Sequence, residues 1–560
     1  MIDLMTTAGE NLTGTPWTVY PRPQMKRDSY ISLNGGWDFT VDCEKMGQIR
    51  VPFCPESKLS GIGKHFDEGS LLCYNRNFAL PEGFNRGRVL LHIGAADQRA
   101  DVFLNNKPVG WHKGGYESFA LDITDHLQQE NSLQICCFDD LTDQSYPYGK
   151  QVLQEKRGGM WYTPVSGIWQ SVWLESVPEN YIRQLNIENR GCSVTISIEP
   201  AMTGTVIVPK LGNFPLVDGS VTLTPENPNL WSPENPYLYD FVVEAGEDRI
   251  ESYFAIRSLE VKQVGAYKRL CLNGNPYFFH GLLDQGYWPD GIFTPATPEC
   301  YADDILMMKK LGFNTLRKHI KVEPEEFYYQ CDKLGMIVWQ DMVNNSDYNF
   351  FRDTVLPTVG IQKLRDLNLH KDEFSRKRFL EGMAATVNQL KNHPSICYWT
   401  IFNEAWGQFD SDNVFEQFKK LDDTRFVDST SGWFRQKKSD VDSRHVYFRK
   451  VNLKAADKPL VLSEFGGKTY KTEGHIFNPD KSYGYGGCET LEALNEALVK
   501  LYTEEIIPCV KQGLCASIYT QVSDVEDEIN GLVTYDRKVE KVDPAKLLPI
   551  AAELQQALEG

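Results

Sequence analysis

The chain has 560 residues, of which 41% are hydrophobic and 24% are charged, as in an ordinary soluble globular protein of roughly three or four domains. Its formal net charge of −18 would repel nucleic acid and anionic membranes, so we expect neither as a partner. Residues 1–10 lack the basic start and apolar run of a signal peptide, and no apolar stretch of about 18 residues could span a membrane.

The thirteen cysteines are scattered along the chain. Only Cys136 and Cys137 are close in sequence, and no C-x-x-C motif occurs. This pattern favours reduced, mostly buried thiols in a cytoplasmic protein over a disulfide framework or a zinc site.

The first 262 residues predict two all-β units. Residues 1–180 are rich in Trp, Tyr, Gly and Pro and contain short alternating runs at 88–93 and 101–104, followed by a turn at 105–108. Many short strands with turn signals indicate a β-sandwich. Residues 181–262 alternate again at 192–198 and 205–208, and their size suits an immunoglobulin-like sandwich.

From about residue 265 the pattern alternates between strands and helices, which predicts a (β/α)₈ barrel over residues 263–560. The predicted helices include residues 303–311, 323–334, 373–391 and 490–511. The predicted strands are residues 277–280, 315–317, 336–339, 396–402, 425–427, 445–447, 460–462 and 516–519. The fifth strand has the shortest apolar run, because polar residues flank it on both sides.

Two glutamates follow buried strands of this barrel. Glu404 comes after the apolar run 396–402 and Asn403, and Glu464 follows the run 460–462 and Ser463. Catalytic groups of parallel barrels lie at the carboxyl ends of the strands. A pair of carboxylates on separate strands there is what glycoside hydrolysis requires.

Motifs along the whole chain resemble glycoside hydrolase family 2, the family of β-galactosidases, β-glucuronidases and β-mannosidases. They are residues 167–175 (GIWQSVWLE), 272–281 (LNGNPYFFHG), 312–317 (GFNTLR) and 530–537 (NGLVTYDR), together with the two glutamate motifs. The resemblance implies a jelly-roll sugar-binding sandwich over 1–180, an immunoglobulin-like sandwich over 181–262 and a catalytic TIM barrel over 263–560.

Carried over from the family, Glu404 matches the acid/base and Glu464 the nucleophile of a retaining, exo-acting hydrolase that forms a covalent glycosyl-enzyme. Such enzymes hold the two carboxyls about 5–5.5 Å apart, with the acid protonated and the nucleophile ionised. An inactive carbohydrate-binding protein and a transglycosylase are the alternatives from other classes.

Further residues are predicted to bind the sugar. Asn403 matches the family amide that contacts the 2-hydroxyl, Tyr447 the tyrosine beside the nucleophile, and Arg317 a cation that holds the nucleophile. Other polar and aromatic candidates at strand ends are His319, Asp341, Asp284, Gln285, Trp406, Tyr519, Trp288 and Trp433. Trp399 lies inside a predicted strand and is expected to be core.

The identity of the sugar stays open between several glycosides. The lysine that family glucuronidases place in an Asn-x-Lys pair is absent, and Glu528 stands nearby, which counts against a uronide. A metal-binding Glu-x-His pair is also absent after the third strand, so we expect no metal or other cofactor. A β-galactoside-like substrate is our main expectation; a β-glucuronide, β-galacturonide or α-L-arabinoside is the alternative.

Loops 344–372 and 468–488 are expected to shape the pocket rim, and the two sandwiches offer surface for a homo-oligomer.

Overall fold

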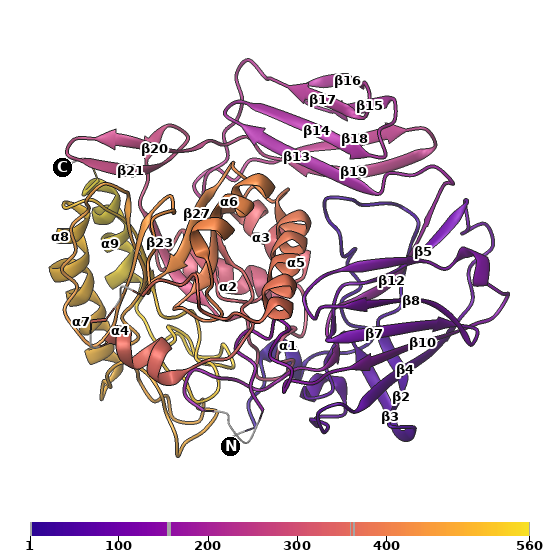
Figure 1. Ribbon diagram of the computed structural model, residues 1–560, viewed down its shortest axis with the longest axis horizontal. Helices are drawn as coiled ribbons and strands as arrows, with labels where there is room; N and C mark the ends of the chain where they lie inside the picture. The colour runs from indigo at the N-terminus through magenta and orange to yellow at the C-terminus, as the bar shows by residue number, and fades with distance from the viewer. Residues whose placement is uncertain (1–2, 154–157, 359, 362–363, 559–560) are drawn as a thin grey trace.

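The computed structural model describes residues 3–153, 158–358, 360–361 and 364–558. Three units make up the molecule (Figure 1): a barrel at the left of the view, a β-sandwich at the right and a smaller β-sandwich above them. The fold class predicted from the sequence is confirmed. Each sandwich has an apolar core of its own, and the barrel has one core inside its strands and another between strands and helices.

The first unit is a sandwich of antiparallel sheets. A four-stranded sheet in the order β1-β12-β5-β9 packs on a six-stranded sheet in the order β3-β2-β4-β10-β7-β8, and β11 pairs with β6. Inward-facing apolar side chains alternate with exposed ones along strands such as β2, which is why the sheets have one buried face. The strands are β1 (Tyr30–Ser32), β2 (Gly35–Val41), β3 (Glu44–Val51), β4 (Leu71–Phe78), β5 (Arg88–Ile93), β6 (Ala96–Asp97), β7 (Arg99–Leu104), β8 (Lys107–Lys113), β9 (Phe119–Asp122), β10 (Asn131–Phe138), β11 (Gly167–Ile168) and β12 (Val172–Val177).

A disulfide within this sandwich corrects the expectation of reduced thiols. Cys73 and Cys136 are bonded to each other, because β4 and β10 place them directly opposite each other with their Cα atoms 4.1 Å apart. The register of two strands separated by 63 residues cannot be seen in cysteine spacing. Eleven cysteines are free, and eight of these are buried, as expected.

The second unit is a seven-stranded sandwich of immunoglobulin type. Three strands in the order β13-β14-β17 face four in the order β16-β15-β18-β19. A short antiparallel sheet of β20, β21 and β22 then leads into the barrel. The strands are β13 (Gln184–Arg190), β14 (Ser193–Glu199), β15 (Gly204–Val208), β16 (Gly212–Leu216), β17 (Ser220–Leu223), β18 (Tyr239–Ala245), β19 (Asp248–Phe254), β20 (Leu259–Val264), β21 (Tyr267–Leu272) and β22 (Asn275–Pro276).

The third unit is an eight-stranded parallel barrel in the hydrogen-bonded order β27-β26-β25-β24-β23-β30-β29-β28. All of its strands except β28 are buried at every position, since helices or other segments cover the outer face and side chains fill the inside. The strands are β23 (Phe279–Asp284), β24 (Thr315–Lys318), β25 (Ile337–Asp341), β26 (Ile396–Asn403), β27 (Phe426–Ser431), β28 (Asp442–Val446), β29 (Leu460–Phe465) and β30 (Leu514–Tyr519).

The predicted strands and helices of the barrel are present with shifted ends. Strand β27 runs past the predicted 425–427 to Ser431, because its polar residues hydrogen-bond inside the barrel instead of forming an apolar run. The predicted helix 490–511 is α7, a π-helical turn (Tyr502–Ile506) and α8 in sequence. The helices are α1 (Thr7–Glu10), α2 (Glu299–Lys310), α3 (Glu325–Leu334), α4 (Leu356–Thr358), α5 (Glu373–Leu390), α6 (Ser411–Leu421), α7 (Leu491–Leu501), α8 (Ile507–Val510) and α9 (Pro544–Gln556).

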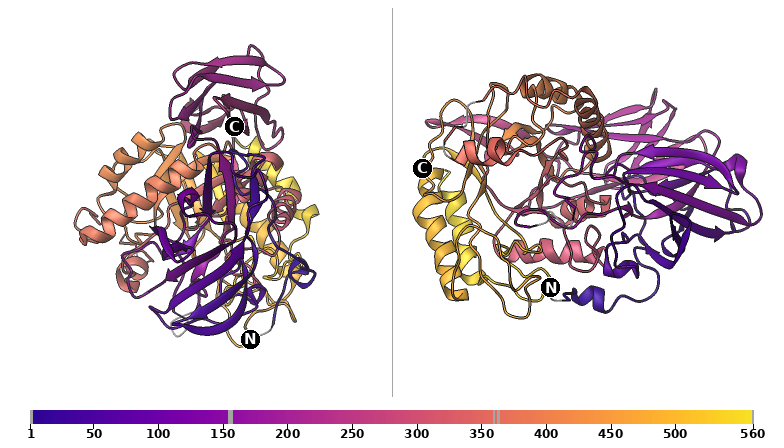
Figure 2. Two further views of the ribbon diagram at one scale, coloured as in Figure 1. Left: turned by 90° about the vertical axis from the view of Figure 1, so that its right-hand side faces the viewer. Right: turned by 60° about the horizontal axis from the view of Figure 1, so that its bottom comes forward.

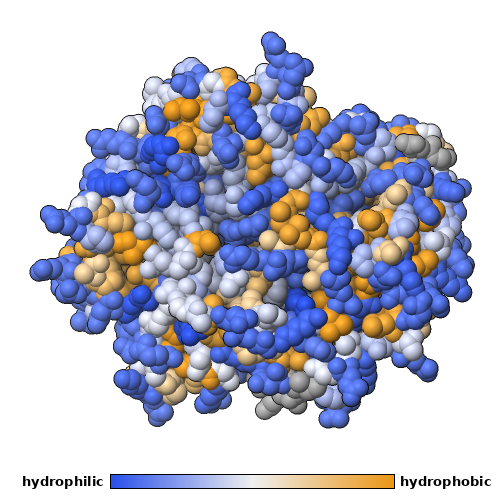
Figure 3. All heavy atoms as spheres, turned by 180° about the vertical axis from the view of Figure 1, so that it is seen from behind, coloured by the Kyte–Doolittle hydropathy of each residue, from blue (hydrophilic) through white to orange (hydrophobic). Residues whose placement is uncertain are grey.

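The first sandwich extends away from the barrel, whereas its loops reach back to the barrel rim (Figure 2). Tyr148 donates its hydroxyl to the carbonyl of Ser346 at 2.8 Å, and the Trp161 ring stacks on Trp406 with 5.1 Å between centroids. Over the face seen in Figure 3, hydrophilic residues predominate and hydrophobic ones lie in small groups. Within the described part of the chain, none of the helices has the length and apolarity that a membrane crossing requires.

Candidate active site

The carboxyl ends of the barrel strands bring the two predicted catalytic glutamates together. Glu464 is the fifth residue of β29, and Glu404 follows Asn403, the last residue of β26. Glu404 and Ala405 have positive φ angles of 47° and 66°, which turn the chain sharply after the strand. This strained conformation is uncommon for residues with a side chain and is often found at functional sites.

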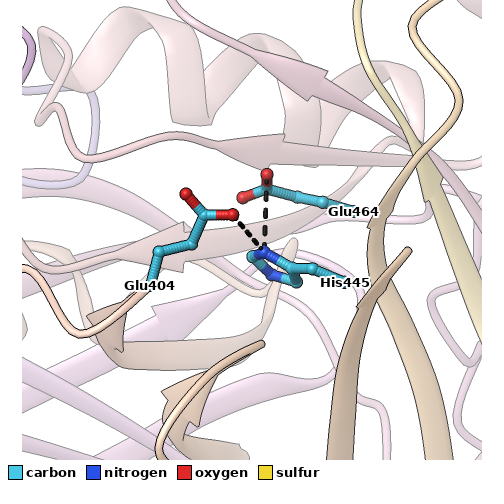
Figure 4. A group of neighbouring side chains, drawn as sticks. All are labelled: Glu404, His445 and Glu464. Carbon is cyan, nitrogen blue, oxygen red and sulfur yellow. Dashed lines mark hydrogen bonds and ion pairs between the residues drawn. The ribbon is translucent and has the colours of Figure 1, made fainter. Parts of the chain in front are cut away.

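The side chains of Glu404 and Glu464 converge on one imidazole (Figure 4). His445 Nδ1, from β28, lies 2.8 Å from Glu404 Oε1 and 3.6 Å from Glu464 Oε2. One oxygen of each carboxylate and a nitrogen of His445 all lie within 4.8 Å of one another. On the other side of its ring, His445 Nε2 is 3.0 Å from Ser431 Oγ.

Glu464 is buried and held as an anion. Arg317 donates from a guanidinium nitrogen to Oε1 at 3.0 Å, and the Tyr447 hydroxyl donates to Oε2 at 2.6 Å. Burial by itself raises the pKa of Glu464, but the charges of His445 and Arg317 outweigh burial and lower the pKa to about 2. Burial and the neighbouring carboxylate raise the pKa of Tyr447 well above its usual value, so the phenol stays a donor.

Arg317 connects most of the predicted sugar-binding residues. It is fully buried and donates to both Asp341 oxygens at 3.0 and 3.1 Å and to Asn403 Oδ1 at 2.8 Å. His319 Nδ1 lies 2.8 Å from the same Asp341 carboxylate. Burial raises the pKa of Asp341, yet the interactions with Arg317 and His319 together outweigh burial and hold the pKa below the usual range. Burial lowers the pKa of His319, which favours the neutral imidazole.

The side-chain amide of Asn403 is only half paired within the described part of the protein. Its side-chain oxygen is occupied by Arg317, while Nδ2 is buried without a hydrogen-bond partner among the described residues. A buried, unpaired donor costs about 1–3 kcal/mol. A ligand hydroxyl placed beside Glu404 and Glu464 would remove that cost.

A cation also faces this region from the first sandwich. Lys150 is only 6% exposed, and its ammonium lies 5.2 Å from the Trp406 ring and 5.7 Å from the Tyr162 ring. Burial lowers the pKa of Lys150, and the charges of Glu528, Glu464 and Glu404 act in the opposite direction. The predicted Trp406 therefore borders the site between His319 and Lys150.

Glu528 does not stand free in the site as the sequence suggested. Its carboxylate accepts hydrogen bonds from the Tyr162 hydroxyl and from Asn530 Nδ2. Burial raises the pKa of Glu528 and the Lys150 charge lowers it. The repulsion that this residue would exert on an anionic sugar is therefore reduced by its neighbours.

Several other predicted residues have side chains engaged elsewhere. Asp284 accepts from Lys318 at 2.7 Å, and Gln285 donates to Gln521 at 2.7 Å. The Tyr519 hydroxyl accepts from the Lys468 amide at 2.9 Å, which ties β30 to the loop after Glu464. The Trp288 ring lies under the guanidinium of Arg537, and Trp399 donates to Asp422 in the core, as expected for Trp399.

The Glu404, His445 and Glu464 cluster has a spacing that a metal ion could also use. However, the Arg317 guanidinium lies 3.0 Å from Glu464 and places a fixed positive charge against the cluster. A metal ion bound by this cluster would lie close to the guanidinium, and two positive charges repel strongly in a buried site. We therefore interpret the cluster as a hydrogen-bonded acid pair, and the absence of a required metal stays a prediction.

Comparison with protein families accounts for all three units. A model of the sugar binding domain of Glycosyl hydrolases family 2 matches residues 64–178, a second model of the family matches residues 180–257, and its TIM barrel domain matches residues 266–542. The chain belongs to glycoside hydrolase family 2. The resemblance inferred from the motifs is thereby confirmed.

Individual members of the family are distant in sequence. A β-glucuronidase of Bacteroides fragilis is 22% identical over 503 residues, 81% of this chain and 68% of that protein. A β-galactosidase of Thermoanaerobacter pseudethanolicus is 22% identical over 504 residues, 81% of this chain and 63% of that protein. The solved structure of a β-D-glucuronidase from Dictyoglomus thermophilum has a TM-score of 0.72 at 19% identity and covers 96% of this chain and 98% of that one. These likenesses support the fold and leave the sugar open.

Two residues at the site were not predicted from the sequence. His445 lies two positions before Tyr447, and residues two apart along a strand share a face. The predicted position of Tyr447 could therefore have indicated that His445 also faces the site. Lys150 gave no such signal, because it reaches the Trp406 ring from another domain.

Proposed function

We propose that this protein is a retaining, exo-acting β-glycosidase that works through a covalent glycosyl-enzyme. The observation that carries the proposal is the pair of carboxylates with oxygens within 4.8 Å, one of which is held ionised with a pKa of about 2. Retaining enzymes keep their carboxyls about 5–5.5 Å apart, whereas inverting enzymes need about 6.5–9.5 Å to admit a water molecule.

In the first step, a carboxylate oxygen of Glu464 attacks the anomeric carbon. The bond from that carbon to the leaving-group oxygen breaks, and protonated Glu404 gives its proton to this oxygen. Asn403 Nδ2 and Arg317 hold the sugar and the nucleophile, respectively, in the attacking geometry. The products are a glycosyl ester on Glu464, a free alcohol and an ionised Glu404.

In the second step, Glu404 acts as the base. It takes a proton from water, whose oxygen attacks the anomeric carbon and displaces the Glu464 carboxylate. Negative charge returns to Glu464 as this bond breaks, so Tyr447 and Arg317 stabilise the transition state through their hydrogen bonds. Two inversions give net retention.

The residues that border the site favour binding of a terminal sugar. Lys150 and Tyr162 border one side of the barrel mouth, and the Trp161 ring lies against Trp406. A neutral β-galactoside-like sugar is the main candidate. A β-uronide is the second candidate, because Lys150 supplies a buried cation near both glutamates and forms no ion pair within 4.0 Å with any carboxylate of the described residues.

The test is hydrolysis of a panel of aryl glycosides by wild type and by Glu464→Gln. The panel holds the β-galactoside, β-glucoside, β-mannoside, β-glucuronide, β-galacturonide and α-L-arabinoside. The expected result is strong turnover of one sugar that is lost in the variant. Glu175→Gln is the matched control, since Glu175 is also buried and paired with arginines but lies in the first sandwich.

Two outcomes separate the candidates. Turnover of a uronide that falls at least tenfold in Lys150→Met, with no such fall for a neutral sugar, would select the second candidate. Binding of a glycoside without turnover in wild type would indicate the carbohydrate-binding alternative. Cytoplasmic location and assembly into a homo-oligomer stay predictions.

A further inference from the structure

A cavity of about 270 Å³ opens in front of Glu404. Its polar floor consists of Glu404, His445 and Tyr447, the residues around the acid pair. Its walls are largely apolar or aromatic and come from five separate segments of the chain. The wall residues are Met160, Phe350, Trp433, Phe448, Tyr483 and Tyr485.

The aromatic wall continues outward from the nucleophile. Tyr447, which donates to Glu464, stacks on Tyr485 with 4.1 Å between centroids and 21° between planes. Phe448 meets the edge of Tyr485 at 5.2 Å, and Tyr483 meets it at 5.6 Å. An unbroken aromatic surface therefore leads from the acid pair to solvent.

Two phenylalanines of this wall are largely exposed. Phe448 is 77% exposed and Phe350 is 64% exposed. Large apolar side chains grouped in the open at the edge of a cavity are characteristic of binding surfaces. Arg449 and Thr354 also line the cavity, so the surface is not uniformly apolar.

The position of Glu404 decides which part of a substrate meets this wall. Arg317, Asn403 and Asp341, whose polar groups are the candidate partners of sugar hydroxyls, do not line this cavity. Glu404 protonates the leaving group, so the leaving group lies on the side of Glu404 that faces the open cavity. The aromatic wall is therefore a surface for the aglycone.

We propose that this cavity binds an apolar aglycone, either aryl or alkyl, in preference to a second sugar. The inference rests on the proposed glycosidase function and specifies its substrate class. Aromatic rings also stack on sugars, but stacked sugars need hydroxyl partners around them, and the outer wall offers mainly hydrocarbon.

The experiment compares hexyl and methyl glycosides of the sugar that the panel identifies. Both leaving groups are primary alkanols of similar acidity, so the ratio of their kcat/KM values reports contacts with the alkyl chain. We expect a ratio of about 30 or more in wild type, since each buried methylene contributes substantially to binding. Phe448→Ala and Phe350→Ala should each lower the ratio about fivefold or more.

Phe374→Ala is the matched control. Phe374 is 71% exposed, like the two wall residues, but does not line the cavity. Its variant should keep the hexyl-to-methyl ratio within about twofold of wild type, since no contact with the aglycone is lost. A fall equal to that of Phe448→Ala would assign the effect to general surface changes and overturn the inference.

Failure of the inference and failure of the proposed function are distinguishable. Good turnover with a ratio near one, or a disaccharide preferred to the hexyl glycoside, would overturn the apolar aglycone site and leave the glycosidase intact. If no glycoside is hydrolysed, the proposed glycosidase function is wrong. The aglycone site is then tested by calorimetric measurement of the affinities of hexyl and methyl β-D-galactoside and β-D-glucuronide. Equal affinities would overturn it, and tighter hexyl binding that Phe448→Ala removes would support it.

Discussion

Replacing Tyr447 with phenylalanine removes one hydroxyl that donates to Glu464 Oε2 at 2.6 Å. Hydrogen bonds to charged groups contribute about 1.5–3 kcal/mol. In the proposed mechanism, this bond is weak in the neutral glycosyl ester and becomes strong again as Glu464 departs with its negative charge. The variant should therefore slow the second step by about 10- to 150-fold, the rate equivalent of that energy.

The assay uses an activated aryl glycoside, for which the second step limits turnover. We expect kcat to fall by the stated factor while kcat/KM, which reports the first step, changes far less. Stopped-flow measurement should then show a burst of one equivalent of phenol followed by a slow steady state.

Tyr485→Phe provides the control, because Tyr485 stacks on Tyr447 but is hydrogen-bonded to Tyr483 and not to Glu464. Its kcat should stay within about threefold of wild type, as expected for an uncharged hydroxyl pair. An unchanged kcat in Tyr447→Phe, or a loss confined to kcat/KM, would refute the assignment of Tyr447 to the departing carboxylate.

Two further predictions concern stability. Arg317→Ala leaves Asp341 and Glu464 buried without their shared cation, so unfolding in urea should show a loss of about 3–5 kcal/mol, and a loss below 1 kcal/mol would contradict the buried network. The folded-state pKa of Glu464, about 2, lies below its ordinary value of 4.5, so ionised Glu464 stabilises the fold above pH 4.5 and this contribution disappears as the pH falls toward 2. Urea midpoints of wild type and Glu464→Gln should therefore converge between pH 5 and pH 2.5, and a constant difference would contradict this.

Much of the fold was predictable because barrel strands are buried on both faces and appear as apolar runs. Strand β26 is such a run, and its end located Asn403 and Glu404 correctly. Strand β27 extends beyond its apolar part, since Ser431 forms hydrogen bonds with His445 and Ser463 inside the barrel. Whether a polar side chain finds hydrogen-bond partners inside the barrel depends on the neighbouring strands, so it cannot be read from the local sequence.

Contacts between distant segments account for what the sequence did not predict. The Cys73–Cys136 bond depends on the register of two strands, and Lys150 reaches the Trp406 ring across a domain boundary. Tyr447 and Arg317 were placed by resemblance beside Glu464, the proposed nucleophile, and both donate to it. Asp284 was a candidate because it ends the first barrel strand, and it does end β23, yet its carboxylate pairs with Lys318. The end of a strand fixes where the backbone of a residue lies, whereas the neighbouring residues decide where its side chain points.

The covalent intermediate is the central claim, and trapping it is the most direct test. A 2-deoxy-2-fluoro glycosyl fluoride of the sugar identified by the panel slows both steps, while its good leaving group keeps the first step the faster of the two. We predict that the intact mass of the protein increases by one fluorosugar and that the label lies on the peptide containing Glu464. Label on another residue, or turnover that inverts the anomeric centre with no adduct, would contradict the account.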